Sequence, residues 1–196
     1  MSVRVSEQAP AVKADALFPN GKFEQIDLTR YRGKWVVVFF YPLDFTFVCP
    51  TELHAFQEEL DAFEQRNCQV IACSVDSVYS HLAWLNTPKT KGGIQGIQYP
   101  LVSDLQKTIA NAFGVLKEDG VAYRAQFLLD RKGVIRHFLI NDLPIGRSVD
   151  EALRTLDALI HHEVYGDVCP ANWTKGTKGM SADQEGVIDY FQDQLS

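Results

Sequence analysis

Hydrophobic residues in this chain occur in short runs that are separated by polar stretches and glycines. Four of the runs have the length and apolar character of buried strands, and they cover residues 35–41, 69–75, 124–130 and 134–140. Arg131-Lys-Gly133 lies between the last two runs and is typical of a hairpin turn. We therefore expect a sheet with buried central strands.

The stretches between these strands have the spacing of helices. In residues 51–66, apolar side chains recur every three or four positions, at Leu53, Phe56, Leu60 and Phe63. Further helices are predicted at residues 78–87, at residues 105–113 and in the long segment that Ser148 caps. Residues 3–34 indicate short strands and turns, and residues 91–96 a flexible loop. Strands that alternate with helices indicate an α/β layered domain.

The chain has 196 residues, which suits one domain with a sizeable core and an extension. We expect residues 1–164 to form the domain and residues 165–196 to be a C-terminal extension. The extension has little apolar material for a core of its own. It is therefore expected to pack on the body of the same chain or on a second subunit.

Composition excludes several classes of protein. Hydrophobic residues make up 46% and charged residues 22%, which is an ordinary globular mixture. A net charge of −6 without a basic stripe argues against binding nucleic acid. No apolar run reaches the roughly 18 residues that span a bilayer, so no membrane segment is expected. The N-terminus lacks the apolar core of a signal peptide, which predicts a cytoplasmic protein.

The cysteines form no recognisable scaffold. There are four, at positions 49, 68, 73 and 169, too few for a disulfide framework in a chain of this length. Their spacing contains no C-x-x-C pair, and the five histidines have no metal-ligand spacing, so we expect no metal site.

Cys49 has surroundings that suit a reactive thiol. It follows the first buried run at the predicted start of a helix, where unpaired amides and the helix dipole favour an anion. Pro50 suits the first turn of a helix, and Thr46 can reach the sulfur with its hydroxyl. A free cysteine is more often a small apolar filler, but a filler requires none of these features. Because the thiolate is the reactive form of cysteine, we interpret Cys49 as a nucleophile.

Two longer motifs enclose cysteines. Phe40-Tyr-Pro-Leu-Asp-Phe-Thr-Phe-Val-Cys-Pro-Thr-Glu52 contains Cys49, and Tyr165-Gly-Asp-Val-Cys-Pro-Ala-Asn-Trp173 contains Cys169. These motifs resemble the two signatures of the peroxiredoxins, specifically the typical 2-Cys group that includes the peroxidase component of bacterial alkyl hydroperoxide reductase. The resemblance covers nearly the whole chain. It implies a thioredoxin-like fold with N-terminal additions and a thiol-dependent peroxidase that reduces hydrogen peroxide and organic hydroperoxides.

The resemblance also implies a role for several residues of the first motif and for one arginine. Cys49 corresponds to the peroxidatic cysteine, which attacks the peroxide and becomes a sulfenic acid. Thr46 corresponds to the hydroxyl that binds the sulfur and the peroxide, and Pro42 to the residue that shields the site from water. Arg124 corresponds to the arginine that stabilises the thiolate and polarises the peroxide. Glu52 corresponds to a residue that orients this arginine.

Cys169 corresponds to the resolving cysteine, whose thiol condenses with the Cys49 sulfenic acid to form a disulfide. In the family this bond joins two subunits, and thioredoxin or a dedicated flavoprotein reduces it. The resemblance thus implies a homodimer, assembled into a ring of dimers, and no cofactor.

Four other residues receive structural interpretations. Cys68 and Cys73 match no catalytic position, and Cys73 is expected in the core because it lies in a predicted strand. Trp84 and Trp173 are expected to be packing groups, although their equivalents in the family lie near the active site.

One segment departs from the family pattern. Members that excess peroxide easily inactivates carry Gly-Gly-Leu-Gly in the loop that here follows Pro88, and Tyr-Phe near the C-terminus. In this chain the loop reads Gly92-Gly-Ile-Gln95, while Tyr190-Phe191 is present. If Gln95 occupies a backbone conformation that favours glycine, the C-terminal helix packs less tightly over the active site. Intermediate sensitivity to overoxidation is therefore predicted.

Two other functions remain as alternatives. One is a holdase chaperone or redox-relay protein, as some members of the family are when they assemble into larger stacks. The other is a general disulfide oxidoreductase on the same fold, which the absence of a C-x-x-C motif disfavours.

Overall fold

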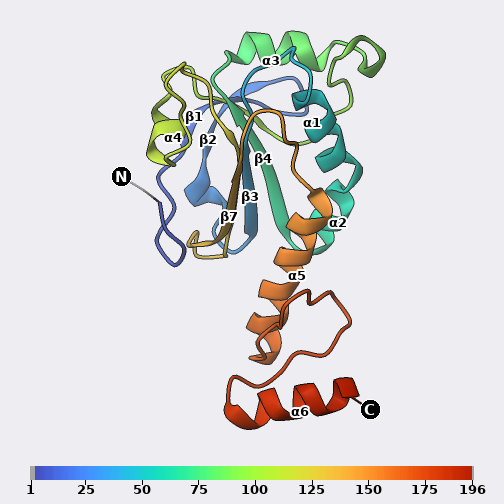
Figure 1. The fold of residues 1–196 in the computed structure, drawn as a ribbon. Coiled ribbons are helices and arrows are strands. Elements are labelled where there is room, and N and C mark those ends of the chain that lie inside the picture. The colour runs from blue at the N-terminus through green and yellow to red at the C-terminus, as the bar shows by residue number, and fades with distance from the viewer. Residues whose placement is uncertain (1–2, 196) are drawn as a thin grey trace. The chain divides into compact units, whose positions relative to one another are not determined.

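The computed structural model describes residues 3–195 and divides into two compact units, Met1–Val149 and Asp150–Ser196 (Figure 1). Residues 1 and 2 of the expected domain and residue 196 of the expected extension lie outside the described part. The domain boundary expected after residue 164 stays a prediction.

A seven-stranded mixed sheet forms the centre of the first unit (Figure 1). Its strands are β1 Lys13–Leu17, β2 Phe23–Asp27, β3 Trp35–Phe40, β4 Cys68–Ser74, β5 Leu101–Ser103, β6 Arg124–Leu129 and β7 Ile135–Asn141. Their order across the sheet is β2-β1-β5-β4-β3-β6-β7. β3 pairs in parallel with β4 and antiparallel with β6, so the first buried run of the sequence is a central strand. The predicted α/β class is confirmed.

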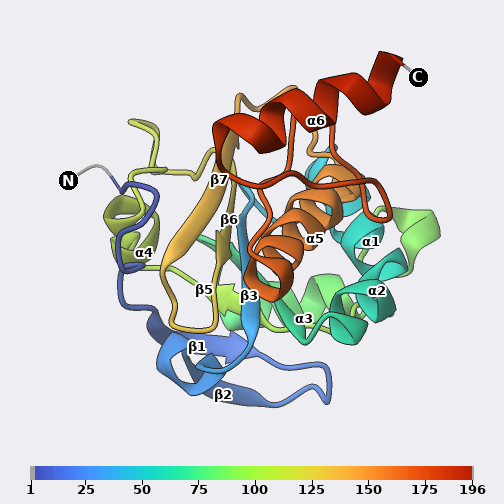
Figure 2. The same ribbon diagram turned by 90° about the horizontal axis from the view of Figure 1, so that it is seen from below.

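Both faces of β3 are buried, which explains its uninterrupted apolar run. Val36, Val38 and Phe40 point into a core that also contains Phe127 of β6. On the opposite face, Phe39 stacks on Phe56 with ring centroids 4.3 Å apart. Figure 2 shows the corresponding layers, with α4 on one side of the sheet and α1 and α2 on the other.

Four helices belong to the first unit: α1 Cys49–Glu58, α2 Leu60–Gln65, α3 Val78–Leu85 and α4 Thr108–Ala112. The single helix predicted at residues 51–66 is therefore two helices, interrupted at Glu59, whose φ and ψ are −100° and 10°. The predicted apolar face is buried on both sides of the break, at Leu53, Phe56, Leu60 and Phe63. Periodicity reports the buried face and not the interruption.

The loop predicted at residues 91–96 is present, but it packs against the chain where a flexible loop was expected. The indole Nε1 of Trp84 donates to Gly92 O at 2.9 Å, and the amide of Ile94 donates to Trp84 O at 3.2 Å. The side chain of Ile94 is fully buried. Backbone hydrogen bonds and burial thus hold this loop against α3.

Gln95 does not take the backbone conformation that its place in the motif predicts. The left-handed region is occupied by its neighbours Gly92 and Gly96, with φ of 74° and 96°, while Gln95 has no positive φ. The amide of Gln95 donates to Thr87 O at 3.1 Å. The expectation that Gln95 occupies a backbone conformation that favours glycine is therefore wrong.

The second unit contains two helices, α5 Val149–Tyr165, which begins at its border, and α6 Gln184–Leu195. They confirm the long helix expected after Ser148 and the amphipathic C-terminal piece. Between them, Val168 and Met180 exchange two backbone hydrogen bonds, of 2.8 and 3.1 Å. Within residues 3–195, no helix is long and apolar enough to cross a membrane.

Candidate active site

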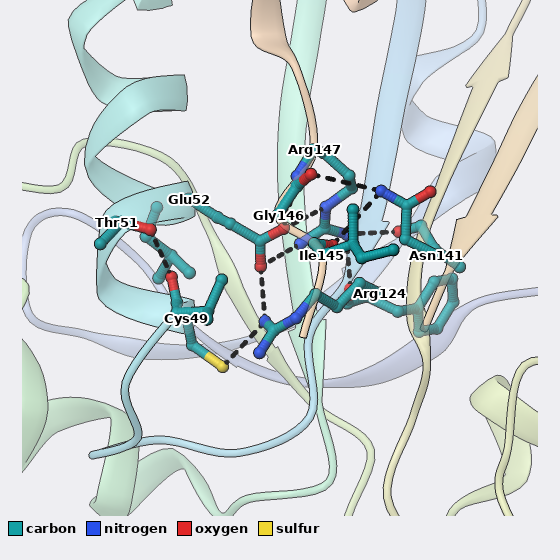
Figure 3. Close-up of polar contacts among 12 residues, drawn as sticks. Cys49, Thr51, Glu52, Arg124, Asn141, Ile145, Gly146 and Arg147 are labelled. Atoms are coloured by element: carbon teal, nitrogen blue, oxygen red, sulfur yellow. Dashed lines mark hydrogen bonds and ion pairs between the residues drawn. The ribbon is translucent and has the colours of Figure 1, made fainter. Parts of the chain in front are cut away.

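Cys49 is the first residue of α1 and lies at the end of the loop that follows β3 (Figure 3). The predicted start of the helix at this cysteine is confirmed, with Pro50 in the first turn. Val48, the N-cap residue, provides no side-chain hydrogen bond to the helix. The Cys49 side chain is buried, so its sulfur faces the N-terminal end of the helix away from bulk water.

The Thr46 hydroxyl contacts the sulfur directly. Its oxygen lies 2.9 Å from Cys49 Sγ and 2.8 Å from Leu43 O. A hydroxyl has one proton to donate. When Cys49 is a thiol, Thr46 can accept a hydrogen bond from it and donate one to Leu43 O. When Cys49 is a thiolate, Thr46 can donate its hydrogen bond to the sulfur. The same contact thus suits both states.

Arg124 reaches the sulfur from β6. Its Nη1 lies 3.3 Å from Cys49 Sγ and donates to Glu52 Oε2 at 2.8 Å. Its Nε donates to Leu143 O at 2.6 Å. The residue is 4% exposed, so these partners fix the plane of the guanidinium in a site that excludes most water. The structure therefore brings together Cys49, Thr46, Arg124 and Glu52, as the sequence predicts.

Arg147 is a second arginine of the site that sequence reasoning missed. Its Nε donates to Glu52 Oε1 at 2.8 Å, and its Nη1 donates to Phe40 O at 2.6 Å and Ala125 O at 2.7 Å. Burial lowers the pKa of Arg147, and the Glu52 carboxylate opposes this shift. Its neighbours Gly146 and Ser148 indicate only a turn and a helix cap, so no local pattern distinguishes it.

The cluster of Arg124, Arg147 and Glu52 has one more positive charge than negative charges. The guanidiniums of Arg124 and Arg147 face the single carboxylate of Glu52, at 2.8 and 2.7 Å. One formal positive charge therefore remains beside Cys49 Sγ, where an anionic sulfur would neutralise it.

The turn after β7 supports both arginines (Figure 3). Asn141, the last residue of β7, donates through Nδ2 to Ile145 O and Gly146 O, each at 3.3 Å. The same turn supplies the Leu143 carbonyl to Arg124. The backbone amide of Arg147, in the same turn, donates to Glu52 Oε1 at 3.1 Å.

The loop between β3 and α1 rests on a buried carboxylate, Asp44, which sequence reasoning also missed. Asp44 accepts hydrogen bonds from Tyr41 Oη and Ser80 Oγ, both at 2.8 Å, and lies 2.9 Å from His81 Nδ1. Its backbone amide donates to Asp76 at 2.9 Å. Burial, and the charge of Asp44, raise the pKa of Asp76. This network holds the loop that carries Thr46.

The other predicted residues take separate places. Pro42 is buried two residues after the end of β3. Trp84 is fully buried in α3 and packs on Tyr41, with ring centroids 6.0 Å apart. Cys169 and Trp173 lie in the second unit.

Two cysteines have the properties of core residues. Burial raises the pKa of Cys68 to about 12, and it raises the pKa of Cys73 well above its usual value. The expected core position of Cys73 is confirmed, since it is 1% exposed within β4. Neither thiol is suited to be a nucleophile near neutral pH. Within residues 3–195, no three His, Cys, Asp or Glu side chains are grouped as metal ligands would be.

Together these contacts describe a site for attack by sulfur on an electrophile. The Cys49 sulfur lies at a helix N-terminus and beside one guanidinium, and the planar fork of Arg124 can bind oxygen atoms next to it. Thr46 Oγ1 offers a hydroxyl on the same sulfur.

Comparisons with known proteins agree with this geometry. Residues 5–138 match the model of the AhpC/TSA family, and residues 158–193 match the model of the C-terminal domain of 1-Cys peroxiredoxin. The second match contains Cys169.

Named relatives are similar over nearly their whole length. The chain is 52% identical to a thioredoxin peroxidase of Trypanosoma brucei rhodesiense over 189 residues, 96% of this chain and 95% of the relative. It is 50% identical to peroxiredoxin-1 of Gallus gallus over 191 residues, 97% of this chain and 96% of the relative.

A solved structure is also similar. The reduced 2-Cys peroxiredoxin of Plasmodium vivax has a TM-score of 0.95 and 51% identity, with coverage of 97% of this chain and 99% of that one. Its likeness confirms the thioredoxin-like fold with a C-terminal extension. The match over more than half of the chain, with these identities, shows that the chain belongs to the AhpC/TSA family as one of its 2-Cys peroxiredoxins.

Proposed function

We propose that this protein is a thiol peroxidase that reduces hydrogen peroxide and organic hydroperoxides. One observation carries the proposal: Cys49 Sγ lies at the start of a helix, 2.9 Å from Thr46 Oγ1 and 3.3 Å from Arg124 Nη1. A peroxide needs a thiolate and donors that polarise its two oxygens, and these groups supply both.

In the first step the Cys49 thiolate attacks one peroxide oxygen, and the O–O bond breaks. The sulfur becomes a sulfenic acid, and the other oxygen leaves with a proton as water or an alcohol. Arg124 binds the oxygens and stabilises the negative charge that develops on the leaving one. Thr46 directs its hydroxyl toward the reacting atoms, and Glu52 keeps the guanidinium in position.

In the second step Cys169 resolves the sulfenic acid. Its thiol condenses with Cys49 to give a disulfide between two subunits, and water is released. Thioredoxin or a flavoprotein disulfide reductase returns both cysteines to thiols. All four cysteines are free thiols in the structure, and a reducing compartment, the cytoplasm, suits this cycle.

Assembly into a homodimer and then a ring of dimers belongs to the same proposal. Large apolar side chains are exposed around the Cys49 loop and α3, at Phe23, Phe45, Phe47 and Tyr79. Phe47 is 92% exposed, and Tyr79, which is 72% exposed, has its ring 5.3 Å from that of Phe23. We refer to these four residues as the apolar loop surface, and we assign to it a contact with a second copy.

The decisive experiment replaces the nucleophile. Reduced Cys49→Ser should lose its reaction with hydrogen peroxide in stopped flow, because the buried thiols have high pKa values and no comparable contacts. Cys73→Ser, which removes a buried thiol from the neighbouring strand, is the matched control and should react at the parental rate. A fast reaction in Cys49→Ser would overturn the assignment. Non-reducing electrophoresis of oxidised parent protein should show a dimer that Cys169→Ser does not form.

A further inference from the structure

Cys169 is held against α5 by contacts within the second unit. Its Sγ lies 3.5 Å from Ala158 O and can donate its proton to this carbonyl. The thiol is partly buried. A carbonyl accepts a hydrogen bond from a thiol but repels a thiolate, so this contact favours the protonated form.

A cation opposes that preference one helical turn earlier. Arg154 precedes Ala158 by four residues, so both lie on the same face of α5. Its Nη1 donates to Trp173 O at 2.9 Å. Arg154 is therefore bound to the segment of residues 169–173, whose first residue is Cys169. Arg154 also forms a two-pronged pair with Glu151, at 2.6 and 2.7 Å, which fixes its guanidinium beside the segment. Burial raises the pKa of Cys169, and the charge of Arg154 opposes this shift.

The carboxylate of Asp167 has the opposite effect on Cys169. Asp167 lies two residues before Cys169, and its charge raises the pKa of the thiol. The Asp167 carboxylate is 3.6 Å from His161 Nε2, and its backbone oxygen is 2.8 Å from His162 Nδ1. Charged and titratable groups of this unit near Cys169 or its contacts include Glu151, Arg154, Asp157, His161, His162 and Asp167, and Asp157 pairs with Lys175 at 3.9 Å.

We propose that Arg154 and Asp167 are opposing positioning residues for resolution, which set how readily Cys169 attacks the Cys49 sulfenic acid. The inference rests on the proposed function, since it takes Cys169 as the resolving cysteine. Arg154 promotes the attack, because a guanidinium stabilises the sulfur anion. Asp167 restrains it, because a carboxylate destabilises a sulfur anion nearby.

The step itself is balanced without another reactant. The Cys169 sulfur forms a bond to the Cys49 sulfur, whose S–O bond breaks. The hydroxide that leaves takes the proton that Cys169 released, so the products are a disulfide and one water. Because the thiolate is the attacking form, the charges of Arg154 and Asp167 change the reactive fraction of Cys169 at a given pH.

The direct test titrates Cys169 in a Cys49→Ser background, where no peroxide chemistry intervenes. Iodoacetamide labelling of Cys169 is followed by mass spectrometry from pH 6 to 10, with buried Cys68 as an internal reference. Arg154→Met should move the labelling midpoint to higher pH and slow labelling at neutral pH about two- to fivefold, a typical effect of one partly exposed charge. Asp167→Asn should move the midpoint to lower pH. Arg154→Lys, which keeps the charge, should restore most of the parental midpoint.

A purely structural role gives a different result. If Arg154 only anchors the segment through Trp173 O, Arg154→Met and Arg154→Lys change the labelling rate by one factor at every pH and leave the midpoint in place. That outcome would overturn the proposal, as would shifts of the same sign for Arg154→Met and Asp167→Asn.

A second measurement links the thiol to resolution. With Cys49 present, single-turnover disulfide formation should slow in Arg154→Met and quicken in Asp167→Asn, while sulfenic acid formation keeps the parental rate. Parental resolution rates in both variants would overturn the link. If the parent protein forms no disulfide after peroxide, the proposed function fails, and the titration of Cys169 still decides whether the two charges act on the thiol.

Discussion

Among single residues, Glu52 has the widest influence on the site, because its two carboxylate oxygens serve two arginines. Oε1 accepts from Arg147 Nε and Oε2 from Arg124 Nη1, each at 2.8 Å. The side chain of Glu52 is 2% exposed, so water cannot replace it as a partner. Glu52 therefore links the position of Arg124 to the folding of the whole cluster.

Replacing Glu52 by Gln should destabilise the protein and also slow its reaction with peroxide. The amide leaves two buried guanidiniums without a counter-charge, which costs about 3 kcal/mol in comparable buried clusters. Urea unfolding of the reduced protein measures this. Glu58→Gln is the matched control, since Glu58 lies on the same helix in an exposed pair with Lys89, and it should change stability by less than about 1 kcal/mol. Equal stability of the two variants would contradict the role given to Glu52.

Replacing Arg124 by Lys should spare the fold and reduce the reaction with peroxide. Lysine keeps the charge but not the planar fork that contacts the sulfur, Glu52 and Leu143 together. We expect a fall of about tenfold or more in the second-order rate constant, measured by stopped flow. Arg136→Lys on β7, an exposed arginine, is the control. An unchanged rate in Arg124→Lys would show that charge alone is sufficient.

At the scale of elements, α1 is fastened differently at its two ends. Its later part is tied to residues 93–99, by Tyr99 Oη to Leu53 O at 2.7 Å and by His54 Nε2 to Gly93 O at 3.0 Å. Its first turn is held by the contacts of Cys49 and Glu52 described above. In the proposed cycle Cys169 reaches the sulfenic acid of Cys49, and we predict that this first turn unwinds for that step while the later part remains in place.

Deleting residues 182–196, which include α6, should make Cys49 more resistant to overoxidation. A C-terminal helix that clamps the first turn slows unwinding, and a second peroxide then has time to form sulfinic acid. Sulfinic acid at Cys49, measured by mass spectrometry during turnover at rising peroxide, provides the readout. Gln95→Gly is the control and should leave sensitivity unchanged, because Gln95 has no positive φ. Identical inactivation of full-length and truncated protein would show that the tail has no such effect.

At the scale of the whole molecule, the proposed contact of the apolar loop surface with a second copy would connect assembly to the site. Phe45 belongs to the Cys49 loop and has a φ of 53°, a conformation that costs a bulky residue about 1 kcal/mol or more. Its ring packs near Trp84 of α3, with centroids 5.8 Å apart. A second copy that covers this surface would also restrain the loop that carries Thr46.

Replacing Phe47 by Ser should weaken assembly of the reduced protein. The side chain is 92% exposed in the isolated chain, so its loss should not unfold the protein, while a contact with a second copy loses a buried aromatic ring. Sedimentation velocity should show a smaller species at a given concentration. Leu105→Ser, at another exposed apolar position, is the control. An unchanged distribution would exclude the apolar loop surface as the interface.

Much of the site is visible in the sequence because it is local. The buried runs, the start of α1 at Cys49 and the reach of Thr46 to the sulfur all follow from spacing within about ten residues. The family resemblance adds Arg124 and Glu52, which the structure places in contact at 2.8 Å. Burial and local backbone geometry leave a periodic record in the residues themselves.

Contacts between distant segments produce no periodic pattern in the sequence, and they become visible only in the folded chain. Arg124 meets Cys49 across 75 positions because β6 pairs with β3, and Arg147 meets Glu52 across 95 because the turn after β7 returns to α1. The break at Glu59 and the three residues of β5 were likewise invisible, since a short element has no full period. The sequence alone thus predicts Cys49 as the nucleophile and the start of its helix, while the pairing of strands positions the charges that surround it.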